Sequence, residues 1–286
     1  MVAARVASES PTAAVIREKA RMARVHAARL MNIAKSGHYG SAYSCVEILA
    51  TLYYGGLLRV RPAEPKWPGR DRLVLSKGHA AVVLYPMLAD LGFFPASALD
   101  NYARLGSAFG DHPDMRRVAG VDFSSGSLGH GLSICVGMAL ALRAQDSRVF
   151  CVLGDGELNE GQVWAAAMSA SNFRLENLVA IVDRNGVSVD GPTEEVMRLE
   201  PLEDKWRAFR WATAVVDGHD PEALLRMLSA HFDVPAGRPL VVIARTVSGK
   251  GISFIEGQFE WHMGHLSAED EQRAFAELET GGRLDG

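Results

Sequence analysis

The chain has few cysteines, no excess of basic residues and no long apolar run. Its three cysteines, Cys45, Cys135 and Cys151, are scattered through apolar segments at spacings that fit neither a zinc site nor a disulfide framework. We therefore expect three buried, reduced thiols and a cytoplasmic location. The formal net charge of −4 and the lack of a Lys/Arg-rich run give no electrostatic reason to expect a nucleic-acid partner.

Segments typical of export or membrane insertion are also missing from the sequence. No apolar run approaches the length of about 20 residues that spans a bilayer, and residues 1–11 have no apolar core of a signal peptide. We expect no membrane partner. The 286 residues, 48% of them hydrophobic, suit a sizeable core. Without a repeat or a linker, we expect a single domain over residues 1–286, with short tails at about 1–11 and 280–286.

What is present is an alternation of strand and helix patterns. We expect strands at residues 72–76, 148–153, 178–183, 212–216 and 240–246. Helices are expected at 12–35, 45–54, 78–91, 128–144, 160–173, 202–209 and 221–229, with a long loop at 106–126. This order is typical of an α/β protein with a doubly wound, mostly parallel sheet and helices on both faces. In such sheets ligands bind beyond the carboxyl ends of the strands.

Two polar loops follow neighbouring predicted strands. Gly154-Asp155-Gly156 comes directly after the run 148–153, and Arg184-Asn185 follows the run 178–183, with Asn185 thirty positions beyond Asp155. Gly-Asp-Gly alone is an ordinary turn sequence, but the whole arrangement of strand, Gly-Asp-Gly, helix, strand and Asp-x-Asn-Gly is more specific. One carboxylate, one amide and the phosphate oxygens of a ligand suit Mg²⁺. The glycines let the backbone approach a phosphate, toward which a helix opening after Gly156 would point its N–H groups.

Five histidines lie in loops: His38, His79, His112 and His130 beside glycine or proline, and His262 after a tryptophan. A single loop histidine is usually a surface residue with one backbone partner. These five lack the i, i+4 spacing of metal ligands, and none lies beside a cysteine. Several in one α/β domain better suit a hydroxyl-bearing or anionic substrate that needs hydrogen bonds and proton transfer near pH 7.

The motifs together resemble those of transketolases. In the order of that family the chain contains Ser36-Gly-His-Tyr-Gly40, Asp71-Arg-Leu-Val-Leu-Ser-Lys-Gly-His-Ala80, Gly126-Ser-Leu-Gly-His-Gly-Leu132, Gly154-Asp-Gly-Glu-Leu-Asn-Glu-Gly161 and Trp261-His262. The resemblance covers about residues 12–270, and only the diphosphate-binding domain of a transketolase is represented. It implies the N-terminal subunit of a split transketolase that uses thiamine diphosphate and Mg²⁺.

The resemblance also implies an activity and partners. A transketolase transfers a two-carbon ketol unit from a ketose, often a phosphate, to an aldose acceptor. A separate C-terminal subunit would carry the pyrimidine-binding domain that this chain lacks. Self-association of this chain with two copies of that partner would give an α₂β₂ assembly with two active sites.

Residue roles follow from the matching positions, beginning with the metal and diphosphate. Asp155 and Asn185 would ligate Mg²⁺ through their side chains, and Val187 through its carbonyl. Gly154 and Gly156 would lie against the diphosphate, with the backbone N–H of Gly156 donating to it.

The resemblance assigns catalytic and substrate contacts to histidines. His79 and His262 would contact the diphosphate side of the cofactor and the region of the reacting carbonyl. His38 and His112 would hydrogen-bond the substrate hydroxyls near the transferred unit.

Further positions would contact the cofactor ring or another subunit. The carbonyl of Gly126 would accept a hydrogen bond from the 4′-amino group, Leu128 would pack on the pyrimidine, and Glu160 would lie at a subunit contact that couples two active sites. Many family members have proline where Tyr39 stands and glutamine where His130 stands. We expect these departures to affect the substrate channel more than cofactor binding.

Two alternatives stay open on the sequence. The chain could be an alpha-type subunit of a 2-oxoacid-decarboxylating enzyme or of a specialised two-carbon transferase of secondary metabolism, although the loops of His38 and His79 resemble transketolase. A non-catalytic paralogue would be expected to lose some of Asp155, Asn185, His79 and His262, and all four are present.

Overall fold

The computed structural model describes residues 12–233 and 237–280. Its main sheet has five parallel strands in the order β1-β2-β3-β7-β6. The strands are β1 (Arg72–Leu75), β2 (Val149–Gly154), β3 (Leu178–Arg184), β6 (Ala212–Asp217) and β7 (Leu240–Arg245). Each of them matches its expected range to within one residue at either end. The predicted parallel α/β architecture is confirmed.

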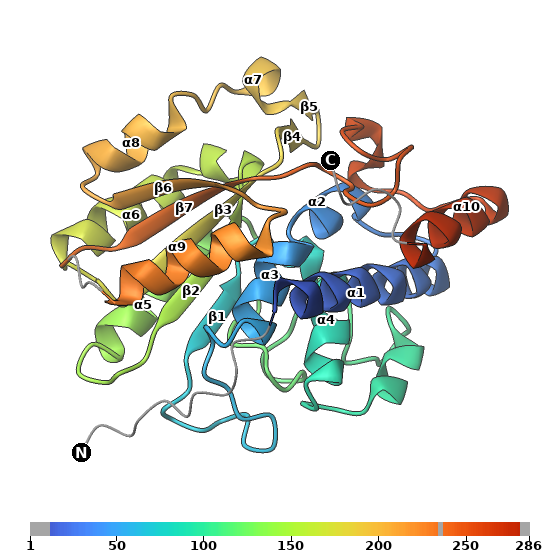
Figure 1. Ribbon diagram of the computed structural model, residues 1–286, viewed down its shortest axis with the longest axis horizontal. Coiled ribbons are helices and arrows are strands. Elements are labelled where there is room, and N and C mark those ends of the chain that lie inside the picture. The colour runs from blue at the N-terminus through green and yellow to red at the C-terminus, as the bar shows by residue number, and fades with distance from the viewer. Residues whose placement is uncertain (1–11, 234–236, 281–286) are drawn as a thin grey trace.

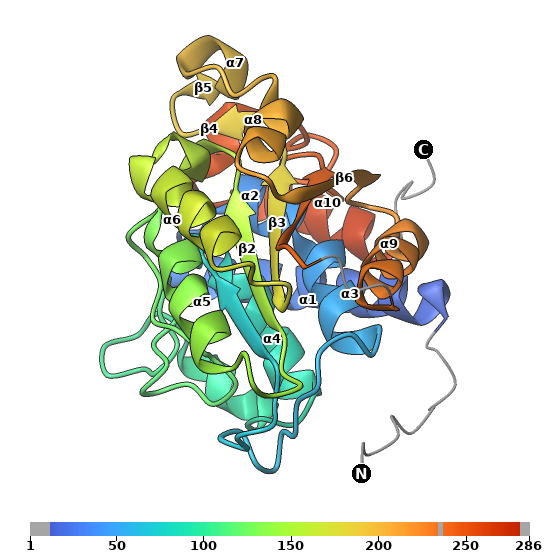
Figure 2. The same ribbon diagram turned by 90° about the vertical axis from the view of Figure 1, so that its left-hand side faces the viewer.

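Helices cover both faces of this sheet (Figures 1 and 2). One face packs against α1 (Ala13–Ala34), α3 (Val46–Tyr54), α4 (Ala81–Asp90) and α9 (Pro221–Asp233). The other packs against α5 (His130–Ala141), α6 (Gly161–Asn172) and α8 (Leu202–Ala208). Alternate residues of each strand enter the two cores: Phe150 and Val152 face the α1 side, whereas Cys151 and Leu153 face the α5 side. Such two-sided burial explains the nearly continuous apolar runs of the strands.

The structure contains elements that the sequence analysis did not anticipate. They are the short helix α2 (Tyr39–Ser44), the hairpin β4 (Val187–Ser188) and β5 (Gly191–Pro192), the turn of helix α7 (Thr193–Val196) and the helix α10 (Ala268–Glu279). The start of α10 had a sequence signal, because Ser267 caps it by accepting a hydrogen bond from the backbone N–H of Asp270 at 3.1 Å. This helix packs along α1.

Other details agree with expectation or refine it. The expected helix at 78–91 begins as the 3₁₀ turn η1 (Gly78–Ala80) and continues as α4, which contains Pro86. Between η2 (Ala96–Asn101) and α5 the described chain contains neither strand nor helix, as expected for the long loop. All three cysteines are buried free thiols, which confirms that prediction. The expected tails, 1–11 and most of 280–286, lie outside the described residues.

Candidate cofactor and active site

The carboxyl ends of β2 and β3 bring Asp155 and Asn185 together. Gly154 pairs in register with Asp183, so the loops after these two strands start side by side. The carboxylate of Asp155 is almost fully buried and accepts hydrogen bonds from the backbone N–H groups of Gly156 at 2.9 Å and Gly186 at 2.7 Å. Burial, with a smaller effect of the neighbouring charge of Asp183, raises the pKa of Asp155 above its ordinary value, against the hydrogen bonds that stabilise the ionised form.

Asn185 faces the same region with its amide oriented by neighbours. Its Oδ1 accepts a hydrogen bond from the backbone N–H of Val187 at 2.9 Å, and its Nδ2 donates to Ser44 Oγ of α2 at 3.3 Å. These two hydrogen bonds fix the orientation of the amide, with Oδ1 toward the N–H of Val187 and Nδ2 toward Ser44. One carboxylate and one amide thus lie at the ends of adjacent strands, as the sequence spacing predicted.

A short helical turn opens directly after Asp155, ahead of the expected helix. Residues Gly156–Asn159 form the 3₁₀ turn η3, and α6 starts at Gly161, within one residue of the helix expected at 160–173. The helix that opens after Gly156 is thus a 3₁₀ turn, and the approach of its N–H groups to an anion stays a prediction. The backbone N–H groups that follow the strand end belong to η3. Asp155 caps this turn, because its side chain accepts a hydrogen bond from the N–H of Gly156.

A buried ion pair, missed by the sequence analysis, lies beneath the strand ends. The Lys77 ammonium, between β1 and η1, donates to the carboxylate of Asp183 and to the Ser41 carbonyl, the latter at 2.7 Å. Asp183 also accepts from Ser44 Oγ at 2.6 Å and from Thr246 Oγ1. Although burial opposes the charge, Asp183 raises the pKa of Lys77 above its ordinary value. The pair ties β1, β3 and α2 together under the candidate site.

Glu157 is a second buried group that the sequence did not single out. Its carboxylate accepts from Ser76 Oγ and from the backbone N–H groups of Gly129 at 2.9 Å and Gly154 at 3.1 Å. It therefore joins the end of β1 and the start of α5 to the Gly-Asp-Gly loop. A glycine is required at 129, where φ is +83° and an added Cβ would lie 2.7 Å from Cβ of Glu160.

Three of the predicted histidines form a cluster. The ring centroids of His38 and His79 lie 5.0 Å apart, those of His38 and His262 5.5 Å, and those of His79 and His262 5.8 Å. They come from the loop before α2, from η1 and from η4 (Phe259–His262), three separate parts of the chain. An antiparallel bridge between Gly37 and Gly264 clamps the first and last of these segments together. The fold thus assembles the set that the motifs predicted.

His112 lies at the edge of this cluster. The carboxylate of Asp111 pairs with both His38, at 3.3 Å from Nδ1, and His112, at 3.7 Å from Nδ1. A Cβ added at Gly126 would come within 3.3 Å of the His112 ring, so the two are neighbours. The approach of this loop to η1 depends on Gly78, where an added Cβ would lie 2.7 Å from Ser125 Oγ.

Two rings of the cluster, those of His79 and His262, have pKa values below the ordinary value of histidine. Burial, followed by the charge of Lys77 and then His38, lowers the pKa of His79 well below its ordinary value. Burial, followed by His38 and Lys77, lowers the pKa of His262 to about 4. Both imidazoles are therefore neutral at pH 7, and each can accept a proton at one nitrogen and donate one at the other.

The remaining predicted residues lie around this centre at different depths. Leu128 is half-buried, whereas Glu160 is exposed at the N-cap of α6 and His130 is exposed as the first residue of α5. The side chain of Tyr39 is fully buried and packs edge-to-face on Trp261, with ring centroids 6.2 Å apart. The ring therefore supports the segment that carries His262, and an effect of this position on the substrate channel stays a prediction.

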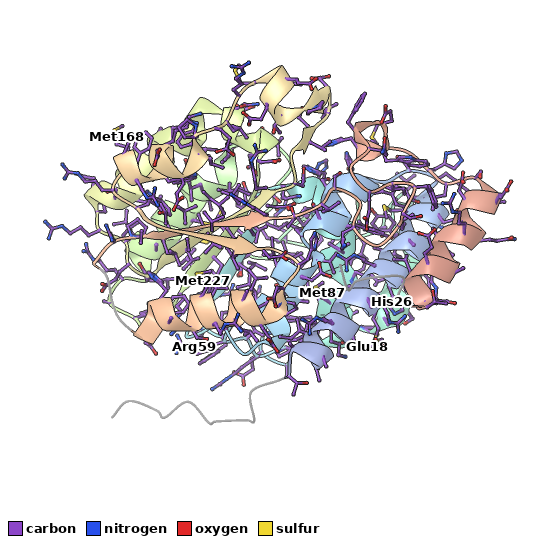
Figure 3. The ribbon with its side chains drawn as sticks, turned by 45° about the horizontal axis from the view of Figure 1, so that its top comes forward. Glu18, His26, Arg59, Met87, Met168 and Met227 are labelled. Carbon is purple, nitrogen blue, oxygen red and sulfur yellow. The ribbon has the colours of Figure 1, made fainter. Side chains whose placement is uncertain are left out.

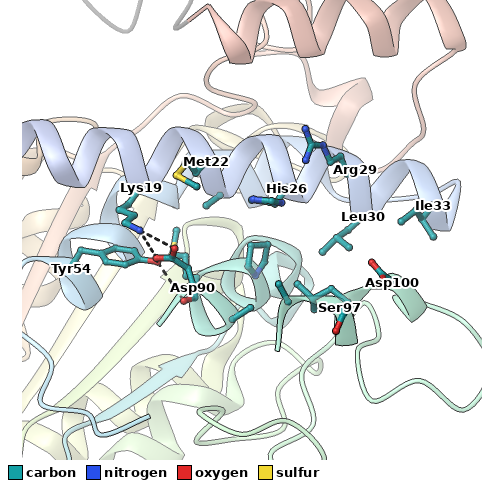
Figure 4. Close-up of a pocket in the computed structure, with 16 residues that line it drawn as sticks. Lys19, Met22, His26, Arg29, Leu30, Ile33, Tyr54, Asp90, Ser97 and Asp100 are labelled. Carbon is teal, nitrogen blue, oxygen red and sulfur yellow. Dashed lines mark hydrogen bonds and ion pairs between the residues drawn. The ribbon is translucent and has the colours of Figure 1, made fainter. Parts of the chain in front are cut away.

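A separate hollow lies between α1, α4 and η2 (Figure 4). Met22, His26 and Leu30 of α1 line it, and Lys19 donates to Asp90 at one end, at 2.7 and 2.9 Å. None of the motif residues lines this hollow. The chemistry indicated by the sequence is therefore concentrated at the strand ends and not here.

The fold and the site together define a thiamine diphosphate-binding α/β domain, and comparison with known proteins identifies the family. Residues 15–279 match the model of the transketolase thiamine diphosphate-binding domain. The chain is 44% identical over 248 residues to the 6-deoxy-6-sulfo-D-fructose transketolase subunit SqwG of a Clostridium species, covering 86% of this chain and 90% of that relative. It is 40% identical over 247 residues to an apulose-4-phosphate transketolase subunit of Phocaeicola vulgatus, covering 86% and 87%.

A solved transketolase structure and the sequence of a whole transketolase also match this chain. The transketolase of Campylobacter jejuni superposes with a TM-score of 0.87 at 30% identity, over 93% of this chain and 43% of that one. Human transketolase is 37% identical over 86% of this chain and 39% of its own length. The chain belongs to the transketolase family and is a transferase subunit of the type that moves two-carbon ketol units.

Proposed function

We propose that this chain is the diphosphate-binding half of a heteromeric, Mg²⁺-dependent transketolase, with residues 1–286 forming one domain. The observation that carries the proposal is the placement of the Asp155–Asn185 pair at two strand ends, next to the cluster of His38, His79 and His262. An anchor for a charged cofactor and a set of histidines suited to proton transfer would thus share one edge of the sheet.

The donor set fits a diphosphate-bound Mg²⁺. Within residues 12–233 and 237–280, no three His, Cys, Asp or Glu side chains gather into a metal cluster. An ion held by the protein alone is therefore not expected. Asp155, the amide oxygen of Asn185 and the carbonyl of Val187 would supply three oxygens, and diphosphate oxygens would complete the shell that Mg²⁺ prefers. Gly154 and Gly156 leave room for the phosphates at the strand end.

The chain's own residues would bind, orient and move protons. When bound, thiamine diphosphate supplies a carbanion and then an electron sink. His79 and His262 would hydrogen-bond the reacting carbonyl oxygen through a ring N–H and donate a proton to it as negative charge develops there, since both rings are neutral at pH 7. Asp111 orients His38, and His38 and His112 would hold substrate hydroxyls. We assign Gly126 and Leu128 to the pyrimidine end of the cofactor.

The substrate proposal is a ketose donor and an aldose acceptor, as free sugars or phosphates. Two relatives are named for sulfofructose and for apulose 4-phosphate, which supports a ketose-type donor without naming the one used here. The alternatives of a 2-oxoacid-decarboxylating subunit and of a non-catalytic paralogue are not favoured, because the relatives are transketolase subunits and every predicted metal and histidine position is retained.

A partner chain is part of the proposal. Whole transketolases extend far beyond the region matched here, which supports a separate subunit with the pyrimidine-binding domain. On the α5–α6 side, Leu140, Met168 and Phe173 are exposed apolar residues, and Figure 3 shows Met168 at the surface. We propose that this surface, with Glu160 at its edge, makes the subunit contact of an α₂β₂ assembly.

We also propose a cytoplasmic location, supported by three buried free thiols. In the described part of the chain no helix has the length and apolar character needed to cross a bilayer.

Reconstitution tests the proposal. The purified chain alone should bind thiamine diphosphate weakly and show no ketol transfer. Addition of the pyrimidine-binding chain, expressed from the neighbouring reading frame, should restore Mg²⁺-dependent binding and turnover of ketose phosphates but not of 2-oxoacids, with 2:2 stoichiometry by light scattering. Ketol transfer by this chain without a partner would overturn the split-subunit proposal.

A further inference from the structure

Arg184, the last residue of β3, uses its whole guanidinium group within the chain. Its Nη1 donates to Asp155 Oδ2 at 2.9 Å and to Thr193 Oγ1 at 2.6 Å. Its Nη2 donates to Glu194 at 2.8 Å and to Glu200 at 3.3 Å, and its Nε donates to Glu200 at 3.4 Å. The side chain is only 12% exposed. Each of the five N–H donors of the guanidinium group thus has an acceptor within the chain, and these bonds fix the plane of the group.

This arrangement limits what Asp155 can offer a cation. A carboxylate has about four lone-pair positions. On Oδ2, the N–H of Gly186 and Nη1 of Arg184 take two of them. On Oδ1, the N–H of Gly156 takes one. The hydrogen bonds of the described residues therefore leave one free position, on Oδ1.

We propose that Arg184 selects the metal ion: by occupying Oδ2 it restricts Asp155 to a single-oxygen ligand, which favours Mg²⁺ over Ca²⁺. Mg²⁺ is small and requires near-octahedral coordination, whereas Ca²⁺ accepts more oxygens and readily takes both oxygens of one carboxylate. The inference rests on the proposed metal site at Asp155 and Asn185. It gives Arg184 the role of a positioning residue that acts through Asp155.

A simple charge effect makes a different prediction. Removal of a cation near the site would strengthen binding of every divalent ion to a similar extent. Removal of the hydrogen bond from Arg184 to Asp155 Oδ2 would instead free a second oxygen as a ligand, and it would strengthen Ca²⁺ binding more than Mg²⁺ binding. The ratio of Mg²⁺ to Ca²⁺ affinity separates the two effects, because a uniform change of charge cancels from it.

The chain offers a matched control at Arg245. This residue ends β7 and stands opposite Arg184 in the strand register, so Arg245→Gln changes the charge equally at nearly the same place. It is exposed, and among the described residues it makes no hydrogen bond to Asp155. Glu194→Gln is a second control, which changes the surroundings of Arg184 and leaves its bond to Asp155 in place.

The test is a metal titration of the full chain mixed with its proposed pyrimidine-binding partner, in which the unfolding temperature of this chain is the readout. Metal-free protein with saturating thiamine diphosphate is titrated with Mg²⁺ or with Ca²⁺, and the rise in the unfolding midpoint gives a half-saturating concentration for each ion. For Arg184→Gln we expect the Mg²⁺/Ca²⁺ preference to shift toward Ca²⁺ by roughly tenfold, the usual scale for a residue that orients a metal ligand. Arg184→Met, which keeps the apolar stem, should give the same shift.

Each result has a distinct meaning. A ratio changed less than twofold in the Arg184 variants, or changed equally in Arg245→Gln, would overturn the inference and leave the proposed site intact. A wild-type complex of the two chains that shows no metal-dependent rise with thiamine diphosphate would overturn both. A shift confined to the Arg184 variants supports the role of Arg184 as the selector.

Discussion

The candidate site has two halves that differ in how the protein holds them. The strand-end half consists of the loops after β2 and β3, and its central carboxylate, Asp155, is saturated by hydrogen bonds except at one position. The histidine half consists of His38, His79, His112 and His262, whose ion pairs within the described residues all go to Asp111. The first half is built as a rigid anchor for charge, whereas the second leaves imidazole nitrogens open for a ligand. Substitutions in the two halves should therefore fail in different ways.

The largest effect is expected at the anchor. Asp155→Ala should abolish Mg²⁺-dependent thiamine diphosphate binding, because the diphosphate would lose the ligand that holds its counter-ion. Binding and activity are measured at limiting cofactor in the presence of the partner chain. Asp146→Ala, which removes an exposed carboxylate far along the surface, is the control. Full activity of Asp155→Ala at limiting cofactor would show that the metal assignment is wrong.

The next largest effect is expected in the histidine half. His79→Ala and His262→Ala should each lower turnover by about 10²-fold or more, the usual scale for a positioned proton-transfer group. Because both rings are also expected to contact the diphosphate side of the cofactor, cofactor binding should weaken, but less than in Asp155→Ala. Steady-state kinetics and cofactor titration of the same samples separate the two quantities. His26→Ala and His231→Ala, on α1 and α9, are controls away from the site. Equal losses at His26 and His79 would indicate general destabilisation instead.

A smaller effect is expected at His112, on the edge of the cluster. Loss of a hydrogen bond to a substrate hydroxyl costs about 1 kcal/mol, so His112→Ala should weaken donor use by roughly fivefold. The change should appear in kcat/KM for the donor, with an unchanged unfolding temperature. A loss as large as that of His79→Ala would place His112 among the proton carriers and not among the binding groups.

The last effect does not concern activity at all, because it is a pH dependence of stability. The pKa of His262 is lowered from its ordinary value near 6.5 to about 4, so the unfolded chain binds a proton that the folded chain refuses. This contribution to stability is complete above pH 6.5 and is lost as the pH falls toward 4. His262→Gln should therefore lose less stability than the wild type between pH 6.5 and 4, as measured by urea unfolding. His265→Gln, an exposed neighbour, is the control, and identical pH profiles of wild type and His262→Gln would contradict the assignment.

The two halves also differ in how far the sequence revealed them. The spacing of Asp155 and Asn185 after two apolar runs located the strand-end half, because adjacent parallel strands must end side by side. The histidines were singled out by their loop positions, but their individual roles came from a family resemblance, since no periodicity connects residue 38 with residue 262. Arg184, Lys77 and Glu157 were missed, because a charged residue at or near the end of a strand gives no sign in the sequence of whether it will be buried or which partner it will meet.

Local pattern alone determined the order of strands and helices, the burial of the cysteines and the position of the Gly-Asp-Gly loop, because each depends on the periodicity of apolar residues or on a short turn. The tertiary structure decided the contacts between segments that lie far apart in the sequence. It packed Tyr39 edge-to-face on Trp261 and joined segments more than two hundred residues apart through the Gly37–Gly264 bridge. Such contacts are selected by the packing of the whole chain, and no neighbouring residues in the sequence encode them.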